Sequence, residues 1–245
     1  MPSPDALLDL RLLGGFAVHI GALEVPPERW TRRKSHALVK LLALAPRHRL
    51  HREQVIEALW PDGDSSLGAN NLNKTLLLAR RALEPALESG SDSRYLHREG
   101  DHLLLSVESE RIDIERFEAA ARAARETGTL AMLDAAVGEY RGDLLPDDAL
   151  EDWTTARREQ LRVLFDDLLL RLADARTGSG DLAGAIDALE RLVHRDPAAE
   201  AAHRRLMELY WCAGQRDRAL RQFEACTAAL ERVVDASPDA ATLAL

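Results

Sequence analysis

The sequence predicts a mostly α-helical protein with a small β part: a winged helix at residues 1–106, followed by an all-α, tetratricopeptide-like domain at residues 107–245. Three observations support this fold class. Strand-type alternation opens the chain, three helical patterns lead into a β-hairpin, and the second half repeats with a period of 34 residues. At 245 residues, the chain is long enough for two domains that each bury a core.

Short antiparallel strands are expected over residues 8–25, where apolar and polar side chains alternate. Gly14 and Gly15 interrupt the alternation, and a turn is expected near Gly21. Pro26 and Pro27 end this sheet. The alternating apolar side chains are those of Leu8, Leu10, Leu12, Phe16, Val18 and Ile20.

Three helices are expected next, at residues 31–45, 51–59 and 66–83, with a polar turn at residues 62–68 before the third. Pro46 ends the first helix, and Trp60 with Pro61 ends the second. The third helix carries a stripe of core residues at helical spacing, namely Leu72, Leu76, Ala79 and Leu83.

A β-hairpin follows these helices, because Gly100 and Asp101 lie between the short apolar runs at residues 95–96 and 103–105. Strands, three helices and a hairpin in this order are the pattern of a winged helix. In that fold, one helix can enter a major groove and the hairpin, or wing, can flank it.

Beyond residue 107 the pattern is helical almost throughout, with helices expected at residues 112–126, 130–140, 151–175, 182–194, 200–212 and 216–233. Gly180 and Gly214 lie 34 residues apart, and so do Ala185 and Ala219. Leu172 with Leu206, and Leu189 with Phe223, keep the same spacing. A helix–turn–helix period of 34 residues is typical of tetratricopeptide repeats.

Charge is divided unevenly along the chain, whose formal net charge is −9. Residues 1–105 hold 14 Lys and Arg against 13 Asp and Glu, whereas residues 106–245 hold 18 against 28. The acidic total therefore describes the second half and does not argue against nucleic-acid binding by the first. The two cysteines, Cys212 and Cys226, lie in apolar helical patterns and are expected to be buried free thiols.

No signal peptide is expected at the start of the sequence, and no apolar run reaches the ~20 residues that span a bilayer. A cytoplasmic protein is therefore expected. The sequence lacks the phosphate-loop, dinucleotide, zinc-protease and Cys-x-x-Cys motifs, so we expect no enzyme, no metal site and no cofactor.

Several segments resemble the bacterial transcriptional activator domain family, which includes the SARP-type activators. The resemblance is carried by RRKSHALVKLLALAP, LHREQVIEALWPD, ANNLNKTLLLARRAL, YLHREGDHLLL and IDIERFE, then by YRGDLLPD, Trp153 and ARREQL. It covers roughly residues 8–235, and EALWPD and YRGDLLP are its most specific parts. The resemblance implies a winged helix of the response-regulator type joined to a helical activator domain. It also implies binding to direct repeats in promoter DNA, recruitment of RNA polymerase and association as dimers on DNA.

The helix at residues 66–83 is the candidate recognition helix, because its leucines face inward and its polar side chains face outward. An Asn side chain can pair with adenine, and a Lys side chain can reach guanine or a phosphate. The alternative is an ordinary solvated helix face. Leu77 and Leu78 stand where the resemblance implies polar or basic side chains. The candidate DNA-binding residues of this helix are Asn70, Asn71, Asn73, Lys74 and Arg81.

Other candidate contacts lie outside that helix. Arg32, Arg33 and Lys34 start the first helix, where cations and free N–H groups can hold a phosphate, unless they form a merely solubilising turn. Residues 47–52 form a second basic cluster that is expected more often to point away from DNA. In the wing, the candidates are Arg94, His97 and Arg98, although Glu99 and Asp101 nearby repel phosphate.

Two functions therefore stay open. The first is a DNA-binding transcription regulator, an activator whose partners are double-stranded DNA, RNA polymerase and a second copy. The alternative is a tetratricopeptide-like interaction adaptor that keeps the winged helix without reading DNA, and the acidic net charge together with Leu77 and Leu78 favours it.

Overall fold

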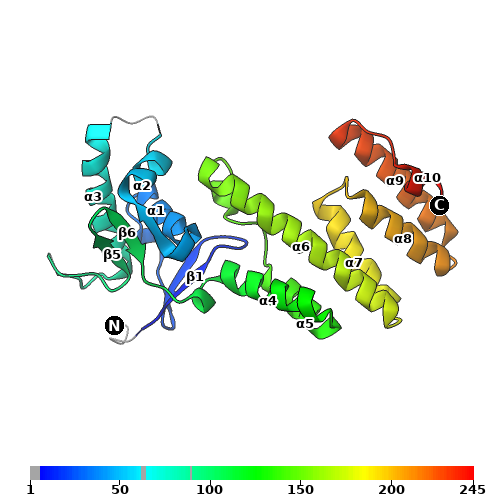
Figure 1. The fold of residues 1–245 in the computed structure, drawn as a ribbon, viewed down its shortest axis with the longest axis horizontal. Helices are drawn as coiled ribbons and strands as arrows, with labels where there is room; N and C mark the ends of the chain where they lie inside the picture. The colour runs from blue at the N-terminus through cyan, green and yellow to red at the C-terminus, as the bar shows by residue number, and fades with distance from the viewer. Residues whose placement is uncertain (1–5, 62–64, 89) are drawn as a thin grey trace. The chain divides into compact units, whose positions relative to one another are not determined.

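The computed structural model describes residues 6–61, 65–88 and 90–245 (Figure 1). Contacts divide these residues into two compact units. Unit 1 comprises the described residues up to Glu118 together with Tyr140–Leu161, and unit 2 comprises Ala119–Glu139 and Arg162–Leu245. Because residues 140–161 return to unit 1, the contacts do not divide at residues 106 and 107. The assignment of residues 1–106 to a DNA-binding domain and of residues 107–245 to a second domain stays a prediction.

The sheet predicted at the start of the chain is present. Strands β1 (Leu8–Arg11), β2 (Ala17–Ile20) and β3 (Leu23–Glu24) are antiparallel in the order β1-β2-β3. Leu8 pairs with Ile20 and Leu10 with Val18, and all four side chains are buried. Gly21 adopts a φ of 58° at the β2–β3 turn, a conformation that glycine reaches without strain. The predicted turn near Gly21 is therefore confirmed.

The three predicted helices of unit 1 are α1 (Arg33–Leu44), α2 (Arg52–Leu59) and α3 (Ser65–Leu83). The 3₁₀ segments are η1 (Pro27–Arg29), η2 (Pro46–His48), η3 (Ser109–Arg111) and η4 (Pro146–Asp148). The polar turn predicted over residues 62–68 falls partly on residues 62–64, outside the described residues. From Ser65 onward the chain is already helical.

The wing is the hairpin of β5 (Leu96–Glu99) and β6 (His102–Leu105). A third strand, β4 (Arg49–His51), pairs antiparallel with β6 and gives the order β4-β6-β5. Strand β4 was not predicted, since three residues are too few for alternation to be recognised. Strands, three helices and a wing confirm the winged-helix fold.

Local contacts start α2 and set its close approach to α3. The His51 Nδ1 atom accepts a hydrogen bond from the Glu53 backbone N–H, while Gln54 Oε1 accepts one from the His51 N–H, a capping box that starts α2. Gly68 of α3 approaches α2 so closely that a Cβ atom there would lie 2.7 Å from Ile56 Cγ2. Glycine is therefore required where the two helices cross.

Segment Tyr140–Leu161 completes unit 1. Leu144 bridges to Leu13, and the Asp113 carboxylate accepts hydrogen bonds from the backbone N–H groups of Leu12 and Leu13, each at 2.9 Å. The Arg158 guanidinium donates to the carbonyl oxygens of Leu144, Leu145 and Asp148. These hydrogen bonds fasten the loop before α6 (Asp152–Gly178).

Unit 2 is helical in the described residues. Its elements are the later part of α4 (Asp113–Thr127), α5 (Leu130–Glu139), the later part of α6, α7 (Leu182–Arg195), α8 (Glu200–Cys212), α9 (Arg216–Val234) and the short α10 (Ala240–Leu243), which was not predicted. Gly180 and Gly214, at φ values of 83° and 73°, precede α7 and α9. Ala185 and Ala219 are both buried, so the 34-residue repeat is structural.

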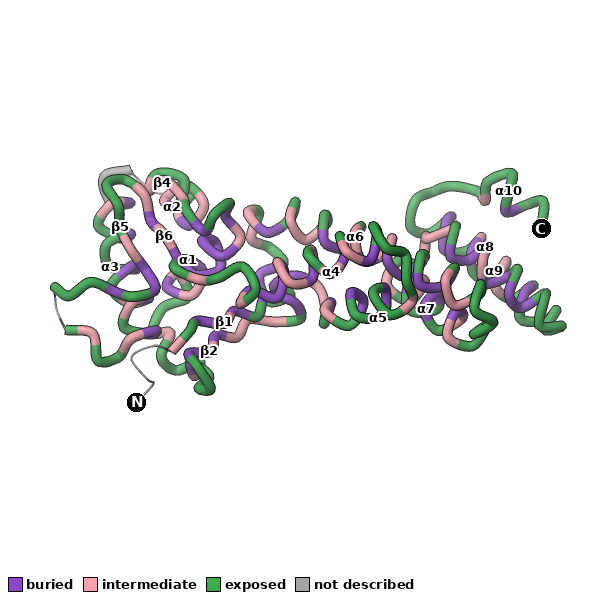
Figure 2. The backbone as a smooth tube through the Cα atoms, turned by 60° about the horizontal axis from the view of Figure 1, so that its bottom comes forward, coloured by how far each residue is buried: buried purple, intermediate pink, exposed green. Residues whose placement is uncertain are grey.

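Burial follows the predicted apolar faces, and Figure 2 shows buried positions recurring along the helices of both units. Cys226 is buried as predicted, but the prediction for Cys212 is wrong, because this last residue of α8 is exposed. Trp211 beside it is also 58% exposed. None of the helices in the described part of the chain is long and apolar enough to cross a membrane.

Candidate nucleic-acid interface

Helix α3 has one buried face and one exposed face, as its sequence predicts. The core residues Leu72, Leu76, Ala79 and Leu83 are each at most 6% exposed. The opposite side carries five exposed side chains at helical spacing, which we call the α3 stripe: Asn70, Asn73, Lys74, Leu77 and Arg81. Asn71 is exposed beside the stripe. The structure thus brings the DNA-binding candidates of this helix, which are the four polar residues of the stripe and Asn71, together on one accessible surface.

The chemistry of the α3 stripe suits hydrogen bonding to base edges and phosphates. Amide side chains both donate and accept, and Lys and Arg donate. Within the described residues, Asn70, Asn71, Lys74 and Arg81 make no side-chain hydrogen bond or ion pair, so their donors face solvent. Leu77, which is 43% exposed, interrupts the polar side chains and can offer a base only an apolar contact such as that with a thymine methyl group.

Arg98 of the wing contacts the α3 stripe directly. Its Nη1 atom donates to Asn73 Oδ1 at 3.3 Å, and its Nε atom donates to the Gly100 carbonyl oxygen at 3.1 Å. Arg98 also lines a small hollow of about 30 Å³ with Arg52, Asn73, Ala69 and Leu72. Two guanidinium groups therefore border the middle of α3.

The wing acids that repel phosphate are paired with arginines. Arg49 lies 3.9 Å from a Glu99 carboxylate oxygen, and Arg52 lies 3.5 Å from one of Asp101. From the sequence, these two arginines were expected to lie in a connection that more often points away from DNA. In the structure, Arg49 lies in β4, which pairs with β6 of the wing, and Arg52 is the first residue of α2.

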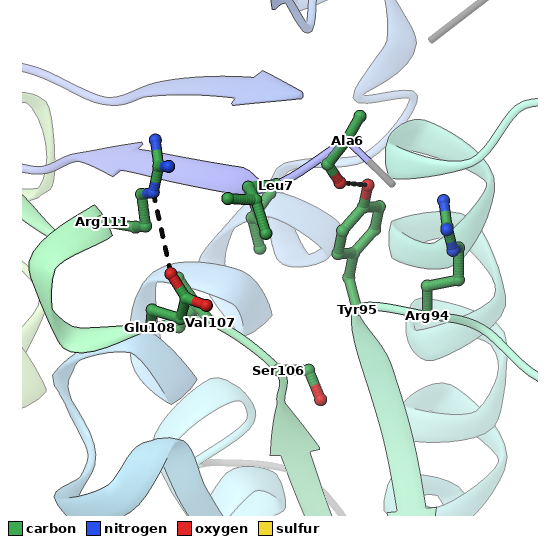
Figure 3. Close-up of a pocket in the computed structure, with 9 residues that line it drawn as sticks. Ala6, Leu7, Arg94, Tyr95, Ser106, Val107, Glu108 and Arg111 are labelled. Atoms are coloured by element: carbon green, nitrogen blue, oxygen red, sulfur yellow. Dashed lines mark hydrogen bonds and ion pairs between the residues drawn. The ribbon is translucent and has the colours of Figure 1, made fainter. Parts of the chain in front are cut away.

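The other two wing candidates have different surroundings. The Arg94 backbone N–H donates to the Glu84 carboxylate, and His97 Nε2 lies 2.9 Å from the Arg94 carbonyl oxygen. Figure 3 shows Arg94 beside Tyr95, whose hydroxyl donates to the Ala6 carbonyl oxygen, at a hollow of about 560 Å³. Arg94 therefore lies at this hollow and takes no part in the Arg98–Asn73 contact.

At the start of α1 the three cations differ. Arg32 is the N-cap residue, and neither its side chain nor that of Lys34 has a partner in the part of the chain that the structure describes. Arg33 Nη2, in contrast, donates to Glu151 Oε1 at 2.9 Å. Only Arg32 and Lys34 thus offer unpaired positive charge at the first turn of this helix, where backbone N–H groups also attract anions.

A half-buried aromatic cluster lies close to this turn. The rings of Phe16, Trp30 and His36 are in mutual contact, with centroids 5.8 to 6.1 Å apart. Burial lowers the pKa of His36, and the positive charge of Lys40 lowers it further. The His36 ring therefore packs against two aromatic rings, and its burial disfavours the protonated form.

Arg80 is turned inward instead of toward a groove, because its Nε atom donates to the Leu96 carbonyl oxygen at 3.0 Å. It thus secures α3 to the wing. Across the described residues, no three His, Cys, Asp or Glu side chains are grouped so as to hold a metal ion.

Comparison with known proteins identifies the family. The family model described as "Bacterial transcriptional activator domain" matches residues 112–245, more than half of the chain. The chain belongs to the bacterial transcriptional activator domain family. Proteins of this family are transcription regulators and not a class of enzymes. The resemblance stated from the sequence is thereby confirmed.

Individual proteins agree with this family assignment. The chain is similar to "Transcriptional regulatory protein MoaR1" of Mycobacterium tuberculosis and of Mycobacterium bovis, at 25% identity over 189 residues in each case. The match covers 73% of this chain and 59% of the MoaR1 sequence, so the chain spans less than two thirds of that relative. A solved structure of Mycobacterium tuberculosis EmbR in complex with a low-affinity phosphopeptide matches with a TM-score of 0.80 and 22% identity. It covers 98% of this chain and 64% of EmbR, and it shows the shared fold.

Proposed function

We propose that this family member binds double-stranded promoter DNA through its winged helix, with the α3 stripe in the major groove. The observation that carries the proposal is the uncovered polar stripe of α3 above a fully buried leucine face. A helix of this kind can be held firmly from below while its Asn and Lys side chains read base edges. The membership of a regulator family supports the same function.

Phosphate contacts would flank this readout. Arg32 and Lys34 carry unpaired charge at the first turn of α1, and Arg33 joins them when its pair with Glu151 opens. On the other side, the wing offers Arg94 and His97 to phosphate, while Arg98 faces the α3 stripe through Asn73. Contacts to phosphate set the position of the protein on the duplex, whereas base contacts set the sequence.

We further propose that the protein is a cytoplasmic activator in which residues 1–106 bind promoter repeats and residues 107–245 contact RNA polymerase or a second copy on DNA. The excess of acidic residues after position 105 supports this division, because an acidic surface favours basic partner surfaces and repels DNA. No cofactor or metal is part of this proposal.

The decisive experiment pairs a selection of genomic fragments with a double variant. The wild-type protein should enrich a small set of fragments that share a common sequence. Asn73→Ala/Lys74→Ala should lose most of that enrichment while keeping its circular-dichroism spectrum and melting temperature, because both side chains are exposed. Arg221→Ala, which removes an exposed positive charge from α9, is the control and should bind like wild type. Equal enrichment by the double variant and wild type would contradict the proposal.

The second candidate function is a protein-interaction adaptor, and one observation favours it. Between α8, α9 and the last residues of the chain lies a largely apolar hollow of about 490 Å³ that includes Trp211 and Leu220. Both side chains are mostly exposed, as expected of a surface that binds another protein. An adaptor without DNA-binding activity would fail to retard duplex DNA even at low salt, which separates the two functions.

A further inference from the structure

The contact between Arg98 and Asn73 joins the wing to the middle of the α3 stripe. Asn73 is the stripe residue whose side chain has a hydrogen-bond partner, with Arg98 Nη1 donating to Asn73 Oδ1 at 3.3 Å. Both side chains are exposed. The contact therefore lies on the surface that the proposed function places against a base pair.

The chemistry of this contact permits one orientation of the amide. A guanidinium group carries donors and no acceptor, so it can face the oxygen of an amide and not its NH₂ group. The Asn73 amide is therefore turned with Oδ1 toward the wing and Nδ2 away from it. Without Arg98, the two ends of the amide would be free to exchange by rotation about the terminal torsion angle, which is broad and roughly two-fold.

Arg98 is itself held in place by the wing turn. Its Nε atom donates to the Gly100 carbonyl oxygen, and Gly100 adopts a φ of 59° that favours glycine. The turn is in turn anchored to α2, because the Arg52 N–H donates to the Asp101 carbonyl oxygen at 2.7 Å and the Arg52 side chain pairs with the Asp101 carboxylate. The guanidinium is thus positioned before any ligand arrives.

We infer that Arg98 is a positioning residue that fixes the amide of Asn73 to read an adenine. The inference rests on the proposed function and names the base that this part of the site recognises. Adenine offers a donor and an acceptor side by side in the major groove, and an asparagine pairs with both. The Asn73 oxygen keeps a second lone pair after accepting from Arg98, and its NH₂ group keeps both hydrogens. A fixed amide reads adenine, whereas a freely rotating one also donates an N–H to a thymine oxygen.

The test measures base preference at every position of the selected site for four proteins: wild type, Arg98→Met, Asn73→Ala and the control Arg221→Met. Wild type and the control should prefer adenine at one position, with discrimination on the order of tenfold. Arg98→Met and Asn73→Ala should both lose that preference, at the same position, and should keep the preferences elsewhere. Arg98→Met should fold normally because the side chain is exposed.

A direct phosphate contact by Arg98 would produce a different result. In that case Arg98→Met would weaken binding to all sequences equally and would reduce the salt slope by about one, which would overturn the inference. Loss of preference at two different positions in the two variants would overturn it as well.

The side-chain amide signals of Asn73, followed by NMR without DNA, separate this inference from the proposed function. If the contact exists, Arg98→Met shifts those signals and Arg221→Met leaves them unchanged. Unshifted signals in Arg98→Met overturn the inference even if the protein binds DNA. Shifted signals in a protein that binds no DNA would overturn the proposed function and, with it, the adenine assignment.

Discussion

Lys40 Nζ lies 2.5 Å from Asp148 Oδ2, and the two side chains are only 3% and 5% exposed. Lys40 belongs to α1 of the winged helix, while Asp148 ends η4 in the segment that returns to unit 1. The ammonium group also lies 4.6 Å from the centroid of the Phe16 ring. This ion pair therefore fastens the segment at residues 140–161 to a helix whose first turn carries candidate phosphate contacts.

Removal of one partner of this pair should be costly. We expect Lys40→Met to lower the free energy of unfolding by about 3–5 kcal/mol, because Asp148 is left buried with its charge unpaired. The double variant Lys40→Met/Asp148→Leu should recover much of that loss, since no isolated charge remains. Urea unfolding of the three proteins measures both values. A Lys40→Met variant within 0.5 kcal/mol of wild type, roughly the effect of an ordinary surface substitution, would show that the pair is not buried in solution.

Asp113 should be needed for the N-terminal sheet. Its carboxylate is buried and accepts the N–H groups of Leu12 and Leu13, which lie directly after β1. We expect Asp113→Ala to cost about 1–3 kcal/mol for each backbone donor left without a partner. Asp113→Asn, which keeps one carbonyl acceptor, should cost less than the alanine variant. Equal stability of wild type and Asp113→Ala in thermal unfolding would contradict the assigned contacts.

His36 should make stability depend on pH. Burial, and then the charge of Lys40, lowers the pKa of His36, although Asp148 acts in the opposite direction and Arg33 adds to the lowering. The unfolded chain therefore takes up a proton near pH 6.5 that the folded chain resists, so unfolding becomes easier as the pH falls through that value. We expect the stability of wild type to fall between pH 7.5 and pH 5.5 by more than that of His36→Phe. A larger loss of stability in His36→Phe than in wild type would contradict a lowered pKa of His36 in the folded protein.

Glu151 should restrain Arg33. The pair is only partly buried, so Glu151→Gln should change stability by less than about 1 kcal/mol. If Arg33 contacts a phosphate, as proposed, its release should raise the affinity for DNA at low salt. Arg33→Ala should abolish this gain in the double variant. Unchanged affinity of Glu151→Gln would remove Arg33 from the set of DNA contacts.

The fold was largely predictable because its core follows strong periodicities. Leu72, Leu76 and Leu83 are buried at the spacing that the sequence shows, and the repeat at Gly180 and Gly214 recurs in the backbone. The short elements β4 and α10 were missed, since three or four residues carry no measurable period. Exposure of Cys212 was missed because a helical pattern alone does not say where a packed face ends.

The candidate site was predicted as a set of residues but not as an arrangement. The exposed face of α3 follows from helical spacing, and the structure confirms that face. The pairing of Arg33 with Glu151 joins residues 118 positions apart, and that of Arg98 with Asn73 joins residues 25 positions apart. Such pairs depend on tertiary packing, which no local pattern encodes. The ion pairs of Arg49 with Glu99 and of Arg52 with Asp101 were not predicted for the same reason.

The salt dependence of duplex binding tests the central claim most directly. We expect the logarithm of the binding constant to fall linearly with the logarithm of salt concentration, with a slope of about −0.9 for each phosphate contacted. The double variant Arg32→Ala/Lys34→Ala should make the slope shallower by the amount expected for the loss of two phosphate contacts. The control Arg221→Ala should leave the slope unchanged. Retardation of duplex DNA at low salt with this behaviour supports DNA binding by the winged helix. Absence of any retardation, or a slope that the α1 variants do not alter, would contradict it.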